Sequence, residues 1–168
     1  MKRAAVIGCG ALGTILVTNF ARAEGWTLTG VMARTKAHAE ALAANAGCRA
    51  ATTLEELLAD KPDLVVEIAG IGAAKAYGEA VLEAGCDFVL VSAGALADAD
   101  WKARMTETAL RTGRRIHVAS GAIGGFDVLQ TVTLMAEALK LDEKAGIETH
   151  TGAKGFRNTP VWADHLLT

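Results

Sequence analysis

A glycine-rich turn close to the start of the chain restricts its fold more than any other feature. Residues 4–7 are apolar, and Gly8, Gly10 and Gly13 follow in the spacing G-x-G-x-x-G before a helical pattern begins. This order predicts a strand, a tight turn and a helix. Gly8 permits the turn, Gly10 leaves room for a diphosphate beside the backbone, and Gly13 lets the helix lie close to the strand. The residues that we expect to hold a diphosphate are Gly8, Gly10, Ala11, Leu12 and Gly13.

Strand and helix patterns alternate from this turn to about residue 120. The strand-like runs are residues 26–33, 48–51, 63–68, 87–91 and 115–119, and the helical patterns between them are 36–46, 54–59, 73–84 and 98–112. Thr53 and Glu56 have the spacing of a capping box, which predicts a helix start at residue 54. The alternation predicts an α/β fold, a doubly wound parallel sheet of the Rossmann type.

The pattern changes after residue 122. A helical pattern extends from about residue 125 to 139, a half-exposed strand pattern covers residues 145–151, and residues 152–168 have little periodicity. We therefore expect a dinucleotide-binding Rossmann domain over residues 1–122. Residues 123–168 would form a connecting helix and the beginning of a second unit that this chain does not complete.

Composition excludes several classes of function. The formal net charge of −2 gives no electrostatic reason to expect a nucleic acid or an anionic membrane as a partner. No apolar run approaches the roughly 20 residues that span a bilayer. The three cysteines are scattered without C-x-x-C spacing, which argues against a metal site and predicts a reducing, cytoplasmic location. Cys9 is interpreted as a small packing residue, although its place at a helix start leaves a reactive thiolate as the alternative.

Ligands of an open parallel sheet bind beyond the carboxyl ends of its strands, so the loops there carry the candidate site. Arg34 and Thr35 follow the second strand, where a carboxylate would select NAD by binding the ribose 2′-hydroxyl. This chain has no acid there, and Arg34 could pair with a phosphate or stack on adenine. A solvated basic helix start is the alternative interpretation. The predicted cofactor is therefore NADP or NAD, with a preference for NADP or acceptance of both.

Three small-residue loops are expected on the nicotinamide side of the cofactor. A flat ring can lie against backbone where side chains are small, and the last loop also precedes a helix start that suits a substrate carboxylate. Helix capping is the alternative role for Ser120, and it is the favoured role for Asp127. The predicted nicotinamide-side residues are Ala69, Gly70, Ser92, Ala93, Gly94, Ser120, Gly121 and Ala122, of which the last three would also bind substrate.

Residues 120–127, SGAIGGFD, resemble the signature loop of the L-aspartate dehydrogenase family, which usually has Leu in place of Phe126. The stretches GCGALG at 8–13, PDLVVEIAG at 62–70 and VSAGAL at 91–96 are similar to the same family. The resemblance implies an NAD(P)-dependent oxidoreductase of NAD biosynthesis. Such an enzyme oxidises L-aspartate to iminoaspartate, which hydrolyses to oxaloacetate and ammonia, or catalyses the reverse reductive amination.

The resemblance also implies two domains, in which an α+β substrate domain follows the nucleotide-binding domain and supplies the catalytic histidine. GAKGFRNTP at 152–160 is similar to the start of that domain, so the general acid/base is expected beyond Thr168. His38 and His117 are interpreted as structural, and His150 and His165 receive no role. Expected partners are a small amino-acid substrate and further copies of the chain in a homo-oligomer. The alternatives are a related homoserine or amino-acid dehydrogenase, and a non-catalytic NAD(P)-binding sensor or assembly domain.

Overall fold

The computed structural model describes residues 1–119, which form one six-stranded sheet in the order β3-β2-β1-β4-β5-β6. Every neighbouring pair of strands is parallel, as predicted for a doubly wound fold. The strands are β1 (Lys2–Ile7), β2 (Trp26–Met32), β3 (Arg49–Ala51), β4 (Leu64–Glu67), β5 (Asp87–Leu90) and β6 (Ile116–Val118). The helices are α1 (Ala11–Asn19), η1 (Phe20–Arg22), α2 (Lys36–Ala46), α3 (Leu54–Leu58), α4 (Ile71–Glu83), η2 (Ala93–Ala97) and α5 (Ala99–Thr112).

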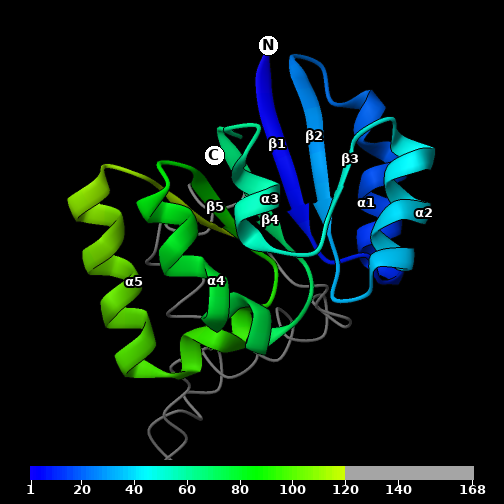
Figure 1. The fold of residues 1–168 in the computed structure, drawn as a ribbon. Helices are drawn as coiled ribbons and strands as arrows, with labels where there is room; N and C mark the ends of the chain where they lie inside the picture. The colour runs from blue at the N-terminus through cyan, green and yellow to red at the C-terminus, as the bar shows by residue number, and fades with distance from the viewer. Residues whose placement is uncertain (120–168) are drawn as a thin grey trace, which may run out of the picture. The chain divides into compact units, whose positions relative to one another are not determined.

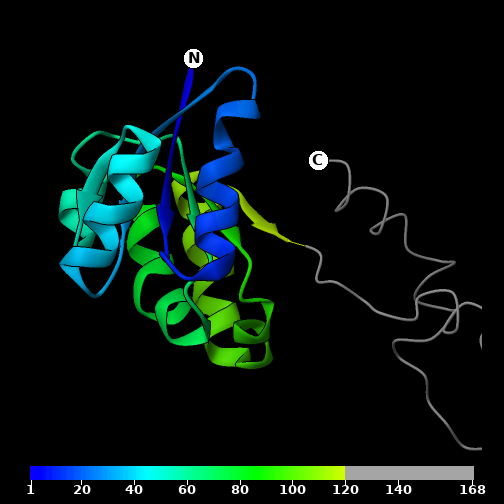
Figure 2. The ribbon, with the colours of Figure 1, turned by 90° about the vertical axis from the view of Figure 1, so that its right-hand side faces the viewer.

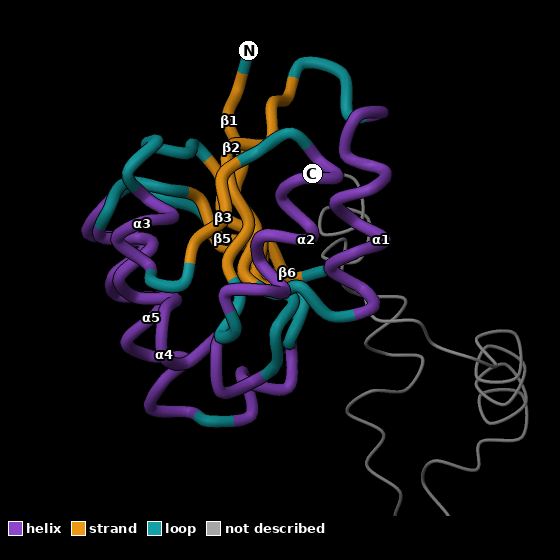
Figure 3. Tube along the Cα trace, turned by 45° about the vertical axis from the view of Figure 1, so that its right-hand side comes forward, coloured by secondary structure: helices purple, strands orange, loops and turns teal. Residues whose placement is uncertain are grey.

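The sheet lies between two layers of helices (Figures 1 and 3). Helices α1 and α2 cover one face, and α3, α4 and α5 cover the other. Successive strands are added outward from β1 through β2 to β3, and the chain then returns to place β4 on the other side of β1. The strand order therefore reverses between β1 and β4, and a ligand site is expected beyond the carboxyl ends of these two strands.

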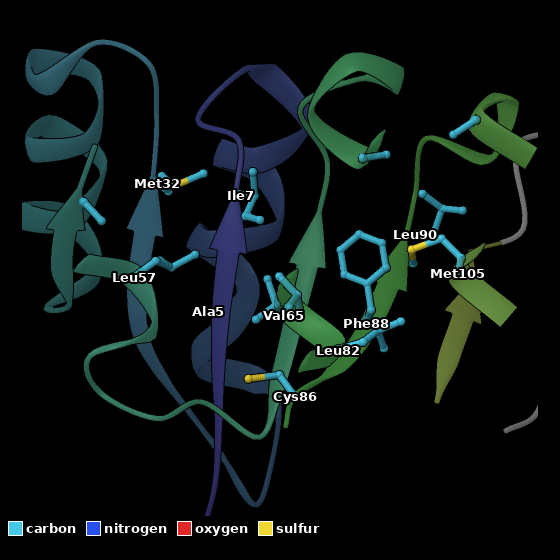
Figure 4. Close-up of a cluster of buried hydrophobic side chains, with 14 of the residues drawn as sticks. Ala5, Ile7, Met32, Leu57, Val65, Leu82, Cys86, Phe88, Leu90 and Met105 are labelled. Carbon is cyan, nitrogen blue, oxygen red and sulfur yellow. The ribbon is translucent and has the colours of Figure 1, made fainter. Parts of the chain in front are cut away.

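Two apolar clusters fill the space between the sheet and its helices. Side chains of alternate residues on one strand point to opposite faces, and both faces are buried in this parallel sheet. Ile7, Val65 and Phe88 contribute to the larger cluster with α3, α4 and α5 (Figure 4), whereas Val6 and Val31 contribute to the smaller one with α1 and α2. The apolar residues of the strands are thus used on both faces, which fixes the positions of the strand ends.

Several element boundaries differ from the sequence predictions. Helix α4 begins at Ile71, two residues earlier than predicted, because Gly70 adopts a φ of 115° and directly precedes the helix. Ala93 and Gly94, predicted in a small-residue loop after the fifth strand, belong to the 3₁₀ helix η2 (Ala93–Ala97). Helix α1 buries Gly13 and Val17, while the apolar Leu12 and Ile15 remain 60% exposed. Because Gly13 lies close to the turn, the face of α1 that carries Gly13 and Val17 packs on the sheet. The face that carries Leu12 and Ile15 points to solvent.

No helix within residues 1–119 combines the length and the apolar character needed to cross a membrane. The predicted boundary at residue 122 and the expected second domain over 123–168 lie outside the described residues. They stay predictions.

Candidate functional site

The glycine turn joins the carboxyl end of β1 to the first residue of α1, which runs back beside the strand (Figure 2). Gly8 has a φ of 123°, and a Cβ there would lie 2.9 Å from the carbonyl carbon of Ile68. A Cβ on Gly13 would overlap the carbonyl oxygen of Gly8. Both positions therefore exclude side chains for reasons of folding. Gly10 differs from them, because a Cβ there would meet no atom within 4 Å.

The start of α1 is an anion-binding feature within this turn. The N-cap residue is Gly10, which has no side chain to bond the free N–H groups, and the first turn contains no acidic residue. The first backbone N–H groups of a helix have no partner within the helix, and the helix dipole adds positive potential at this end. The open space at Gly10 therefore adjoins N–H donors that suit a diphosphate.

A cavity of about 720 Å³ opens beside the turn at the carboxyl ends of the central strands. It brings together residues that the sequence analysis assigned to three parts of a dinucleotide: Gly8 and Gly10 from the turn, Arg34 and Thr35 after β2, and Ala69 after β4. Its other lining residues are Ile7, Cys9, Met32, Ala33, His38, Thr52, Ile68, Gly72, Ala73, Ala76 and Tyr77. A second cavity, of about 320 Å³, includes Trp26 at the amino end of β2, so the larger cavity is the candidate site.

The other predicted site residues do not line this cavity. Within the described residues these are Ala11, Leu12, Gly13, Gly70, Ser92, Ala93 and Gly94. Ala11, Leu12 and Gly13 belong to α1, Gly70 follows β4, and Ser92, Ala93 and Gly94 follow β5. Ser120, Gly121 and Ala122 lie outside the described residues, so their assignment to the nicotinamide side stays a prediction.

The side of the cavity formed after β2 carries basic side chains. Arg34 and His38 both line it, and none of the lining residues from the described part of the chain is acidic. The exposed Lys36 is engaged elsewhere, with its Nζ 3.6 Å from Glu40 one helical turn away. His38, which was interpreted as structural, is exposed on α2 and borders the cavity. Helical periodicity alone did not distinguish the packed face of α2 from the face at the site.

Glu67, at the end of β4, is the residue that the sequence analysis missed. It is fully buried, and its Oε1 accepts hydrogen bonds from the N–H groups of Ala69 (2.7 Å) and Gly70 (2.8 Å). Oε1 also accepts a bond from the Ser92 hydroxyl at 2.9 Å, and Oε2 accepts one from the Ser92 N–H at 3.2 Å. The acid at the end of the apolar run LVVE was the available signal, but one of its partners, Ser92, follows β5 and is distant in sequence.

Cys9 lies in the glycine turn and half-buried against β2. Burial raises the pKa of its thiol, and its Sγ lies 3.6 Å from the Met32 carbonyl oxygen, which it approaches as a weak donor. A raised pKa opposes the thiolate that a reactive cysteine requires. These observations favour the interpretation of Cys9 as a packing residue over the reactive alternative.

Comparison with known families agrees with this geometry. The model of a protein family described as the NAD-binding domain of homoserine dehydrogenase matches residues 8–119. The match begins at the first glycine of the turn and ends with the last described residue, and it covers more than half of the chain. The chain belongs to this family. It is an NAD(P)-binding domain with a Rossmann-type sheet.

Curated relatives confirm the resemblance to L-aspartate dehydrogenases. The protein of that name from Methanospirillum hungatei is 34% identical over 130 residues, which are 77% of this chain and 50% of the relative. The L-aspartate dehydrogenase of Archaeoglobus fulgidus is 41% identical over 88 residues, 52% of this chain and 37% of the relative. This chain thus spans at most about half the length of either relative.

Solved structures agree on the fold. The WlbA dehydrogenase from Bordetella pertussis, determined in complex with NADH and UDP-GlcNAcA, superimposes with a TM-score of 0.67. The similarity covers 80% of this chain and 43% of that protein at 18% identity. At this identity the similarity supports the architecture alone.

Proposed function

We propose that this chain is the cofactor-binding part of an NAD(P)-dependent dehydrogenase that oxidises the amino group of L-aspartate, or catalyses the reverse reductive amination. The observation that carries the proposal is the open glycine turn at the start of α1, which borders a cavity of about 720 Å³ at the point where the strand order reverses. The L-aspartate substrate is supported by the names of the relatives.

The residues present fit a dinucleotide. The backbone around Gly10 would hold the diphosphate, Arg34 and Thr35 would hold the adenosine end, and the loop at Ala69 would lie toward the nicotinamide end. When bound, the cofactor accepts or donates the hydride, and the protein supplies position and electrostatics. The group that exchanges a proton with the substrate is proposed to lie outside the described residues.

We propose further that Arg34 gives the site a preference for NADP or an acceptance of both cofactors. No acidic residue among the described ones borders the cavity near Arg34, so nothing there repels a 2′-phosphate. A guanidinium can pair with that phosphate through two parallel hydrogen bonds.

The variant Arg34→Asp tests the cofactor preference. It should shift the ratio of the NADPH and NADH dissociation constants toward NADH by about tenfold or more, since one change removes a phosphate partner and adds an acceptor for the 2′-hydroxyl. Lys36→Asp is the matched control, because it makes the same change of charge at an exposed residue that does not line the cavity. An equal shift in the control would mean that general charge, and not Arg34, sets the preference.

Substrate assays test the reaction. The 168-residue chain should bind NADH or NADPH in an equilibrium titration. Turnover, followed as formation of reduced cofactor, should be tested with L-aspartate and with homoserine in parallel. Turnover of L-aspartate would support the proposal and would show that the general acid/base lies within this chain. Turnover of homoserine alone would favour the alternative that the family model suggests. Failure to bind either cofactor at saturating concentration would contradict the proposal.

A further inference from the structure

A single buried carboxylate joins two loops of the site that come from neighbouring strands. Glu67 ends β4, and its side chain bonds the first residues of the β4–α4 loop, Ala69 and Gly70. The same carboxylate bonds both the N–H and the hydroxyl of Ser92, which follows β5. Strands β4 and β5 pair in parallel with Glu67 opposite Leu90, so the two loops leave the sheet side by side at its carboxyl edge.

Hydrogen-bond donors surround the buried carboxylate of Glu67. Burying a carboxylate is costly unless hydrogen bonds replace its hydration. None of the ion pairs found within residues 1–119 includes Glu67. Its four bonds come from three backbone N–H groups and one hydroxyl, and it also lies immediately before the positive end of helix α4. An ionised carboxylate accepts all four bonds at once.

The loops held in this way are two of the three loops predicted to lie on the nicotinamide side. Ala69 lines the cavity, and Ser92 directly precedes Ala93 and Gly94 of η2. The hydroxyl of Ser92 is committed to Glu67 at 2.9 Å, so Ser92 supports its loop through Glu67. The Glu67 carboxylate accepts no hydrogen bond from the diphosphate turn at Gly8–Gly13.

From this juxtaposition we infer that Glu67 is a positioning residue for the nicotinamide half of the cofactor. Its bonds to Ala69 and Gly70 hold the loop after β4, and its bonds to Ser92 hold the loop after β5. The inference rests on the proposed function, since it needs a dinucleotide in the cavity. A residue with a structural role alone would affect every ligand of the domain equally, whereas a positioning residue for one half of the cofactor would affect that half.

The variant Glu67→Gln breaks the connection selectively. If the amide oxygen keeps the three bonds of Oε1, the amide NH₂ group faces the Ser92 N–H, and two donors then oppose each other. Binding to the full 168-residue chain is measured with NADPH or NADH and, in parallel, with ADP-ribose or its 2′-phosphate, which lack only the nicotinamide. We expect the dissociation constant of the complete cofactor to rise about tenfold and that of the ADP-ribose probe to change less than about twofold.

The outcomes separate the inference from the proposed function. Equal weakening of both probes, or no weakening of either, in a folded Glu67→Gln variant would overturn the inference and leave the proposed function intact. Failure of the unmodified chain to bind either probe would overturn the proposed function itself. If Glu67→Gln does not fold, Ser92→Ala gives the same comparison, because it removes one donor and leaves the carboxylate with three bonds. A selective loss of complete-cofactor affinity in that variant supports the inference, and any other pattern contradicts it.

Discussion

The three glycines of the turn differ in what a side chain at each position would contact. At Gly8 and Gly13 a methyl group would collide with backbone atoms, which cannot move away as a flexible side chain can. At Gly10 the backbone is extended, with φ −79° and ψ −169°, and the space that a side chain would enter is open. Folding thus requires glycine at two positions, whereas at Gly10 no contact of the described residues excludes a side chain.

Gly10→Val should abolish cofactor binding and leave the fold largely intact. The valine side chain enters the space predicted for the diphosphate, so the affinity for NADPH or NADH should fall at least about a hundredfold. The free energy of unfolding should fall by about 1 kcal/mol or less, because the extended backbone accepts valine and only the preference for glycine at the N-cap is lost.

Gly13→Ala is the matched variant with the opposite expectation. Its methyl group overlaps the Gly8 carbonyl oxygen, so the turn or the helix must shift, at a cost of about 3 kcal/mol in the free energy of unfolding. Chemical denaturation and cofactor titration of both variants make the comparison. Unchanged affinity in a folded Gly10→Val variant would contradict the assignment of the turn to the diphosphate.

The thiols provide a second test at the residue scale. Burial raises the pKa of Cys9, Cys48 and Cys86, and neighbouring carboxylates, Asp63 first, raise that of Cys86 further. A raised pKa lowers the thiolate fraction at neutral pH, so alkylation by iodoacetamide should be slow in the native protein and should accelerate as the pH rises. Cys86 should react slowest, since it is 2% exposed and its Sγ donates to the Pro62 carbonyl at 3.0 Å. Mass spectrometry of labelled peptides measures the order, and preferential labelling of Cys86 would contradict it.

At the scale of elements, local chemistry in the sequence predicted most helix starts and ends. The bounds of α2 agree with the prediction, and Gly47 ends it in the left-handed conformation with a φ of 66°. The capping box of α3 is present, with Thr53 and Glu56 bonded in both directions. These features depend on residues within one turn of each other, so the sequence contains the information needed to predict them.

The features that were not predicted depend on contacts between distant segments. Glu67 meets Ser92 from another strand, and no local pattern indicates which donors surround a buried acid. The outward orientation of Leu12 and Ile15 follows from the approach of Gly13 to the turn. Likewise, His38 borders the cavity because of the way α2 packs on the sheet. Sequence patterns therefore predicted three of the loops that line the cavity, and tertiary packing determined which residues of those loops face it.

Helix α3 allows a test of pH dependence at this scale. The Thr52 and Thr53 N–H groups, together with the Thr52 hydroxyl, hold the pKa of Glu56 below its usual value. A carboxylate with a lowered folded-state pKa stabilises the protein above its unfolded pKa, and this contribution is lost as the pH falls through the folded-state value. Glu56→Gln should therefore lower Tm by about 2 °C at pH 7, and the difference from the unmodified protein should shrink below about pH 4.

Glu55→Gln is the control for this test. Glu55 is exposed in the same first turn of α3. The carboxylate that accepts the bonds from Thr52 and Thr53 is that of Glu56 and not that of Glu55. The control should have a smaller effect on Tm at pH 7. Thermal unfolding monitored by circular dichroism across the acid range measures both variants. A Tm difference for Glu56→Gln that stays constant with pH would show that the capping bonds do not depend on its charge.

For the whole molecule, the strand order explains why distant loops form one site. The reversal between β1 and β4 leaves a gap between the connections on either side, and the carboxyl ends of all six strands lie at one edge of the sheet. The turn after β1 and the loops after β2 and β4 line the same cavity there. The carboxylate of Glu67 extends this arrangement to the loop after β5.

The chain shortened to residues 1–119 tests whether this arrangement is self-sufficient. Within residues 1–119 the sheet has an apolar cluster on each of its faces, so we expect cooperative unfolding by denaturant and an affinity for ADP-ribose within about twofold of the full chain. The affinity for NADPH or NADH should fall by about tenfold, because Ser120, Gly121 and Ala122 are predicted on the nicotinamide side and are removed. Equal affinity of both chains for the complete cofactor would contradict that prediction for the three residues. A shortened chain that is folded but binds neither probe would instead contradict the proposal that the turn after β1 and the loops after β2 and β4 hold the diphosphate and the adenosine.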